Sequence, residues 1–152
     1  MEHSIIHLDD RTDQATKQML TNVVKRKQKY DNFKNRHLTV MTLTMGMATV
    51  FLLYMYLTTI KPYSYSFYEV FSAFFSQPAN LYLFIITGGL FGLMNLLREK
   101  RDKAEKEYHA LRCEIIDKSK DLWKKEDAWK NRHLVYEMMK EKYDINLYHE
   151  NK

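Results

Sequence analysis

Two long uncharged stretches constrain the fold of this chain more than any other feature of its sequence. The first runs from residue 38 to residue 60, and the second from 70 to 97, with its most apolar part beginning at residue 79. A helix rises ~1.5 Å per residue, so about 20 apolar residues cross the hydrocarbon core of a bilayer. Core helices of soluble proteins seldom stay uncharged for so long. We therefore predict two transmembrane helices, residues 38–60 and 79–97.

The charged residues, 28% of the chain, are concentrated outside these two stretches. Lys and Arg gather before the first and after the second, whereas the connection contains only Lys61 and Glu69. The positive-inside rule then places both termini in the cytoplasm. The basic pI reflects these membrane flanks, and we expect no nucleic-acid partner. We expect contacts with anionic lipid headgroups at Lys25, Arg26, Lys27, Lys34, Arg36, Arg98 and Arg101.

The external connection, residues 61–78, is rich in aromatic side chains and is bracketed by Pro62 and Pro78. Phe67, Phe71, Phe74 and Phe75 share one face of a helix, with serines and Glu69 elsewhere. This pattern predicts a short amphipathic helix at the outer membrane interface, where aromatic rings are enriched. A ligand-binding lip is the alternative.

Small and polar residues recur on one face of each predicted span. If Leu38 lies level with Leu97 in an antiparallel pair, the two faces meet. Small residues allow close helix approach in lipid, and polar ones can bond across the contact. We therefore predict helix–helix packing through Thr39, Thr42, Gly46, Gly88, Gly92 and Asn95. The same glycines could instead form the contact of a homodimer.

The predicted cytoplasmic parts are a flexible tail (residues 1–10), a helix (11–37) and a long helix with a C-terminal tail (98–152). The long helix carries apolar residues every seven positions, which is typical of a coiled-coil-like contact. These are Tyr108, Ile115, Leu122, Trp129, Tyr136 and Tyr143. We expect the two helices to pair, with Glu105, Glu107 and Glu114 facing the basic run of residues 25–29.

The long helix extends beyond its partner, because the N-terminal helix ends near the level of Leu122. Three arrangements could cover the apolar residues from 123 to 143. Residues 1–9 could lie along them, the helix could fold back at residues 117–121, or another protein or a second copy could bind. Our hypothesis is a partner-binding surface made of Trp123, Trp129, Tyr136 and Met139.

An eight-residue pattern occurs twice, as DNFKNRHL at residues 31–38 and as DAWKNRHL at residues 127–134. On a straight helix the second copy would lie about 50 Å from the membrane, given ~1.5 Å per residue. If the helix folds back, both copies could lie at the interface. The repeat is either a coincidence of helix-forming basic residues or a shared lipid- or partner-binding element.

Residues that could carry out chemistry are few. His3 and His7 have the spacing of two ligands on a helix, but no third ligand accompanies them. There is no phosphate-binding loop, nucleophile elbow or zinc pattern, and neither span contains an Asp, Glu, Lys, Arg or His. Cys113 is the single cysteine, which excludes an intrachain disulfide. We therefore predict no enzyme activity, no catalytic or metal site and no cofactor.

The layout resembles the YpbF-like family of small two-span membrane proteins from spore-forming Gram-positive bacteria. The similar parts are LTVMTLTMGMATVFLLYMYL, the aromatic connection, TGGLFGLMNLL and REKRDKAEKEYHALRCEI. The resemblance covers almost the whole chain and implies a bacterial plasma membrane, but that family has no established function.

Together these features predict an all-α membrane protein. It would be a two-span antiparallel helical hairpin whose helices extend into a cytoplasmic coiled-coil-like stalk. We expect a scaffold or adaptor in the cell membrane that presents its cytoplasmic helices to an unknown protein partner. The alternative is a small regulatory subunit of a membrane enzyme or transporter, bound through the glycine face.

Overall fold

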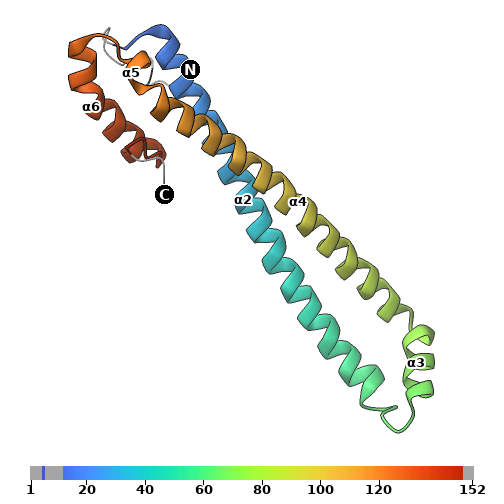
Figure 1. Ribbon diagram of the computed structural model, residues 1–152. Coiled ribbons are helices and arrows are strands. Elements are labelled where there is room, and N and C mark those ends of the chain that lie inside the picture. The colour runs from blue at the N-terminus through green and yellow to red at the C-terminus, as the bar shows by residue number, and fades with distance from the viewer. Residues whose placement is uncertain (1–4, 6–11, 149–152) are drawn as a thin grey trace. The chain divides into compact units, whose positions relative to one another are not determined.

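The computed structural model describes Ile5 and residues 12–148, and all regular structure in that part of the chain is helical (Figure 1). The prediction of an all-α protein is confirmed. The chain forms two compact units: unit 1 is Met1–Phe33 with Arg101–Lys152, and unit 2 is Lys34–Lys100. The helices are α2 (Gln14–Met55), the π-helix η1 (Tyr56–Ile60), α3 (Phe67–Ser76), α4 (Pro78–Asp117), α5 (Ser119–Leu122) and α6 (Glu126–Tyr143).

The ends of these helices follow from local chemistry. Asp13 precedes α2, and its carboxylate accepts a hydrogen bond from the Gln14 N–H at 2.7 Å. Pro78 is the first residue of α4, where its missing N–H and fixed φ suit a helix start. Helix α6 has acidic residues in its first turn and lysines in its last, which complements the helix dipole. Asp144 follows the last residue of α6, and its φ of 55° is left-handed.

Unit 1 closes around a core that forms where the chain reverses after α4. Helix α4 ends at Asp117, and α6 turns back after α5 (Figure 1). The prediction of one long helix over residues 98–152 is therefore wrong, and the fold-back alternative is the one observed. Fully burying a large apolar side chain contributes about 1.5–3 kcal/mol, which favours the reversal. The core contains Ile5, Leu20, Val23, Val24, Tyr108, Ile115, Trp123, Ala128, Val135, Tyr136, Met139, Ile145 and Leu147.

Helices α2 and α4 contact each other within unit 1. The rings of Tyr30 and Tyr108 stack at 6.3 Å with an interplanar angle of 4°. The Lys29 ammonium lies 3.2 Å from a Glu107 carboxylate oxygen, so this part of the predicted charge pairing is confirmed. Glu114 does not pair with the basic run as predicted. It pairs instead with Lys118, four residues further along the chain, at 2.7 Å.

In unit 2, α2 and α4 meet through larger side chains than we predicted. Phe51 is buried and its ring lies 6.4 Å from that of Phe84. Phe51 is five residues after Gly46 and Phe84 five before Gly89, so this contact agrees with the predicted antiparallel register, although it lies away from the glycines. The predicted face is wrong, however, because all six predicted packing residues are exposed: Thr39, Thr42, Gly46, Gly88, Gly92 and Asn95.

The glycines themselves give the physical reason for this difference. A Cβ atom built on Gly46, Gly88 or Gly92 would meet nothing within 4 Å. The helices contact each other through the buried Phe51 and the partly covered Phe84, and no close backbone approach of the kind that requires glycine is seen at these three positions. The glycine face of unit 2 is therefore open to its surroundings.

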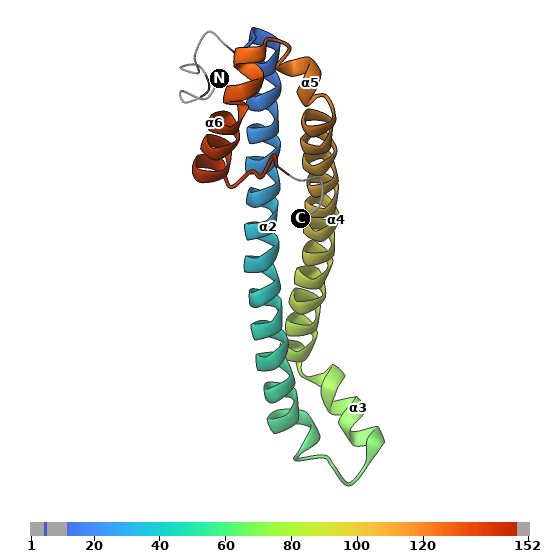
Figure 2. The ribbon, with the colours of Figure 1, turned by 60° about the vertical axis from the view of Figure 1, so that its left-hand side comes forward.

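A buried polar contact ties the connection to the start of α4. Asn80 is 0% exposed, and its amide donates to the Thr59 hydroxyl at 3.2 Å and to the Phe74 carbonyl at 3.3 Å. A buried polar group is costly unless it is hydrogen-bonded, so these bonds hold η1, α3 and α4 together. Helix α3, next to the start of α4 in Figure 2, confirms the predicted short helix in the connection.

The C-terminal segment should contribute strongly to the stability of unit 1, because Ile145 is fully buried in its core. Ile145→Ala should lower the free energy of unfolding by about 2–4 kcal/mol through lost burial and a residual cavity. Leu134→Ala is the matched control, since Leu134 is 56% exposed. Denaturant unfolding followed by tryptophan fluorescence checks both variants. Equal midpoints would show that the segment does not pack on the core.

Candidate functional site

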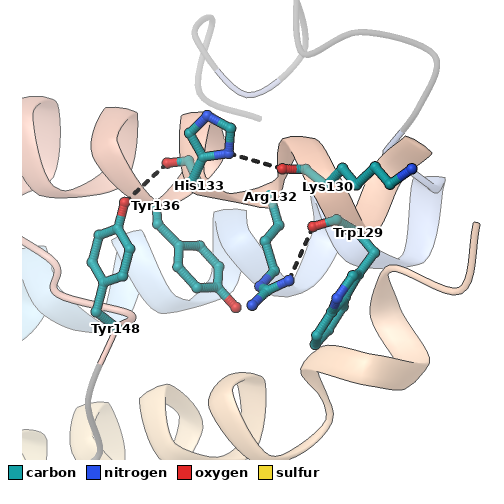
Figure 3. Close-up of a pocket in the computed structure, with 6 residues that line it drawn as sticks. All are labelled: Trp129, Lys130, Arg132, His133, Tyr136 and Tyr148. Atoms are coloured by element: carbon teal, nitrogen blue, oxygen red, sulfur yellow. Dashed lines mark hydrogen bonds between the residues drawn. The ribbon is translucent and has the colours of Figure 1, made fainter. Parts of the chain in front are cut away.

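The second copy of the repeat lines a pocket of 420 Å³ in unit 1. Figure 3 shows its six lining residues, four of which come from the stretch of α6 that holds the repeat. They are Trp129, Lys130, Arg132, His133, Tyr136 and Tyr148. Ligand pockets in proteins have volumes of about 300–1,000 Å³ and combine aromatic walls with a few polar groups. The pocket has both properties.

Arg132 is held in place by its neighbour one helical turn earlier. Its guanidinium carbon lies 3.5 Å from the centre of the Trp129 ring. Its Nη1 donates a hydrogen bond to the Trp129 carbonyl oxygen at 3.0 Å. In Figure 3 the Arg132 side chain lies between Tyr136 and Trp129. Guanidinium has five N–H donors, so one bond to the backbone leaves others for a ligand.

His133 and Tyr148 form the other end of the pocket. The Tyr148 hydroxyl donates to the His133 carbonyl oxygen at 3.2 Å, and its ring meets that of Tyr136 edge-on at 5.2 Å. His133 Nδ1 lies 2.9 Å from the Lys130 carbonyl oxygen. The C-terminal segment therefore supplies one wall, and α6 supplies the rest.

Tyr136 forms the inner wall and belongs to the core as well. Burial raises the pKa of its phenol, while the positive charge of Arg132 acts in the opposite direction. The hydroxyl consequently stays protonated at neutral pH and remains a hydrogen-bond donor. Its ring also packs edge-on against Trp123 at 5.6 Å, which links the pocket to the core of unit 1.

The pocket is cationic. Three of the described residues that line it are basic, and none of these described residues is acidic. Three other cations of unit 1 are paired with carboxylates: Lys29 with Glu107, Lys118 with Glu114 and Arg101 with Asp102. Within residues 12–148, no ion pair joins Lys130, Arg132 or His133 to a carboxylate.

The C-terminal segment is attached to α2 through Lys27. Its ammonium lies 3.3 Å from Asp31 and 3.4 Å from Asp144, and 5.7 Å from the ring centres of Tyr30 and Tyr108. Burial alone would lower the pKa of Lys27, but the hydrogen bond and charge of Asp31 outweigh it, so the pKa is raised. Asp144 is 93% exposed, so its bond to Lys27 contributes little by itself.

This arrangement corrects one of the predicted lipid contacts. The Lys27 side chain is only 14% exposed and is occupied inside unit 1. Arg101 is partly exposed and pairs with Asp102, and Arg26 donates to the Glu107 carbonyl oxygen at 3.0 Å. The other six predicted contacts stay predictions: Lys25, Arg26, Lys34, Arg36, Arg98 and Arg101.

The predicted partner surface is wrong for three of its four residues. Trp123, Tyr136 and Met139 are 2%, 5% and 0% exposed, because the chain reversal places them in the core. Trp129 is partly buried at the pocket. We missed the basic side of the pocket, although the repeated KNRHL was the signal for it. We also missed Asn80, because no pattern in the sequence singles it out.

Metal ligands do not gather in the part of the chain that the structure describes: no three His, Cys, Asp or Glu side chains there could hold an ion together. His3 and His7 lie outside the described residues. Glu105 and His109 lie one helical turn apart on α4, with 3.8 Å between Oε1 and Nε2.

Comparison with known proteins places the chain in a family. Residues 19–150 match the family described as "Protein of unknown function (DUF2663)". The chain is 37% identical over 155 residues, covering 100% of both proteins, to the "Uncharacterized protein YpbF" of Bacillus subtilis (strain 168). No solved structure matches it. The chain therefore belongs to the DUF2663 family of proteins of unknown function and is similar to YpbF along its whole length.

Proposed function

We propose that this protein is a non-enzymatic scaffold or adaptor, anchored in the cell membrane by residues 38–60 and 79–97, that presents unit 1 to a protein partner in the cytoplasm. Helices α2 and α4 each contribute residues to both units without a break. A membrane-embedded unit 2 would therefore keep unit 1 at the membrane surface.

The exposure of apolar side chains supports the membrane anchor. Two helical stretches, Gln14–Ile60 and Pro78–Asp117, are long and apolar enough to span a membrane. Only 11% and 6% of their most apolar windows are buried, whereas a core helix of a soluble protein is mostly buried. Lipid would cover this surface. The exposed side chains include Leu52, Leu53, Leu57, Phe84, Ile85 and Phe91.

The observation that carries the adaptor proposal is the position of the remaining exposed apolar residues. Among the described residues outside 38–96, only Leu134 and Tyr148 are large, apolar and exposed, at 56% and 43%. Leu134 ends the second repeat, and Tyr148 bonds to the adjacent His133. We name the α6 surface as Trp129, Lys130, His133, Leu134 and Tyr148. Its partner would combine an apolar contact with acidic residues that complement Lys130 and His133.

The topology of the proposal can be tested by cysteine labelling in intact cells. In a Cys113→Ser background, a membrane-impermeant maleimide should modify Ser64→Cys because the connection lies outside. It should modify Lys124→Cys only after the cells are permeabilised. Labelling of Lys124→Cys in intact cells would place unit 1 outside and overturn the cytoplasmic adaptor.

Partner docking can be tested by site-specific photo-crosslinking in the native cell. A photo-reactive amino acid at Tyr148 should give a discrete protein adduct, and one at Lys103, an exposed position on α4, should not. Adding Leu134→Glu should remove the adduct, because it places a charge at the apolar contact and repels acidic residues. An adduct that persists with Leu134→Glu would contradict docking at the α6 surface.

The open glycine face favours a second candidate function, a regulatory subunit of a membrane enzyme or transporter. Gly46, Gly88 and Gly92 leave room for another helix to approach closely. Gly88→Leu should leave the unfolding midpoint unchanged, since no neighbour lies within 4 Å of the new Cβ. If this function holds, the same variant should lose a membrane partner that co-purifies with the wild type. Retention of every such partner would exclude the glycine face as their docking site.

A further inference from the structure

We propose that the pocket on unit 1 binds a phosphate monoester. This inference goes beyond the adaptor function, because it assigns a small anionic ligand to the protein itself. The pocket shares Trp129, Lys130, His133 and Tyr148 with the α6 surface, but the ligand site centres on Arg132 and the partner contact on the exposed Leu134.

The charge of the pocket points to an anion. Lys130, Arg132 and His133 line one cavity, and no carboxylate of residues 12–148 lines it. Acidic residues stand within one helical turn, since Glu126 and Asp127 precede Lys130 by four and three positions. Pairs at this spacing are common on helices, yet neither forms here. A phosphate monoester carries a charge of about −1.5 to −2 at neutral pH and suits such a cluster better than a single carboxylate does.

The arrangement of Arg132 points to a prepared site rather than a solvated charge. Stacking on Trp129 and the bond to its carbonyl hold the guanidinium in one orientation. Arginine binds phosphate through several N–H donors in a fixed plane, so a restrained guanidinium loses little entropy on binding. Lys130 is exposed and its flexible side chain can turn toward the same anion.

The size of the pocket points to an ester rather than the inorganic ion alone. Its volume of 420 Å³ exceeds that of a phosphate group, and Trp129, Tyr136 and Tyr148 offer apolar walls for the attached organic part. The ester could be a soluble metabolite or a lipid with a monoester headgroup. Both present the same dianion, so the experiment has one arm for each source.

The first arm is calorimetric titration of the full chain, held in nanodiscs of phosphatidylcholine, with glycerol 3-phosphate. The second arm is ³¹P NMR of the headgroup resonance in nanodiscs that also contain phosphatidic acid. Binding in the first arm identifies a soluble source, and a shifted headgroup resonance identifies a lipid source. Either result supports the site when it depends on the pocket residues.

Lys130→Gln and Arg132→Gln should each weaken binding by about tenfold or more, because each removes a charge-assisted hydrogen bond. Lys140→Gln is the matched control, an exposed lysine of the same helix outside the pocket, and should bind as the wild type does. Lys130→Gln is the decisive variant, since its exposed side chain can be changed without disturbing the core.

Two results would overturn the proposal: no binding in either arm, or binding that Lys130→Gln and Lys140→Gln weaken equally. Acetate that competes as well as glycerol 3-phosphate would overturn the assignment to phosphate. Neither arm contains a protein partner, so failure here leaves the adaptor function standing. Conversely, a failure to crosslink a protein partner would not contradict the phosphate site.

Discussion

The cost of leaving large apolar side chains in water determines the structure of unit 1. Trp123, Tyr136 and Met139 come after the end of the helix pair formed by α2 and α4, so a straight helix would expose them. The reversal between Asp117 and Glu126 brings α6 back, and all three become buried. Ile145 and Leu147 then complete the core. The pocket depends on a second turn, at Asp144 after α6, beyond which the Tyr148 hydroxyl bonds back to His133 of α6.

Burial of apolar side chains does not account for unit 2 in the same way, because its apolar residues remain largely exposed. Its helices contact each other through Phe51 and Phe84, and one buried polar side chain, Asn80, ties η1 and α3 to α4. In the proposed membrane location the hydrophobic effect would not drive such helices together, so packing and hydrogen bonds would have to do so.

The two copies of the repeat show how one local pattern acquires different surroundings. In the first copy Asp31 pairs with Lys27 of the same helix, and His37 is buried. In the second copy the matching histidine, His133, is exposed beside a cationic pocket, and Asp127 pairs with none of the pocket residues. Trp129 replaces Phe33 in the pattern, and its indole supports Arg132. The difference comes from what packs against each helix.

Local sequence determined the helical character of the chain and its division into charged and uncharged segments, because these depend on residue spacing within one segment. It also predicted the pairing of Lys29 with Glu107. Only the tertiary structure decided which face of each helix is covered, since glycine and phenylalanine faces fit a helical period equally well. The reversal likewise needed the whole of unit 1: no Gly or Pro marks it in residues 117–126. The gain that favours it comes from contacts with α2 and the C-terminal segment, far away in the chain.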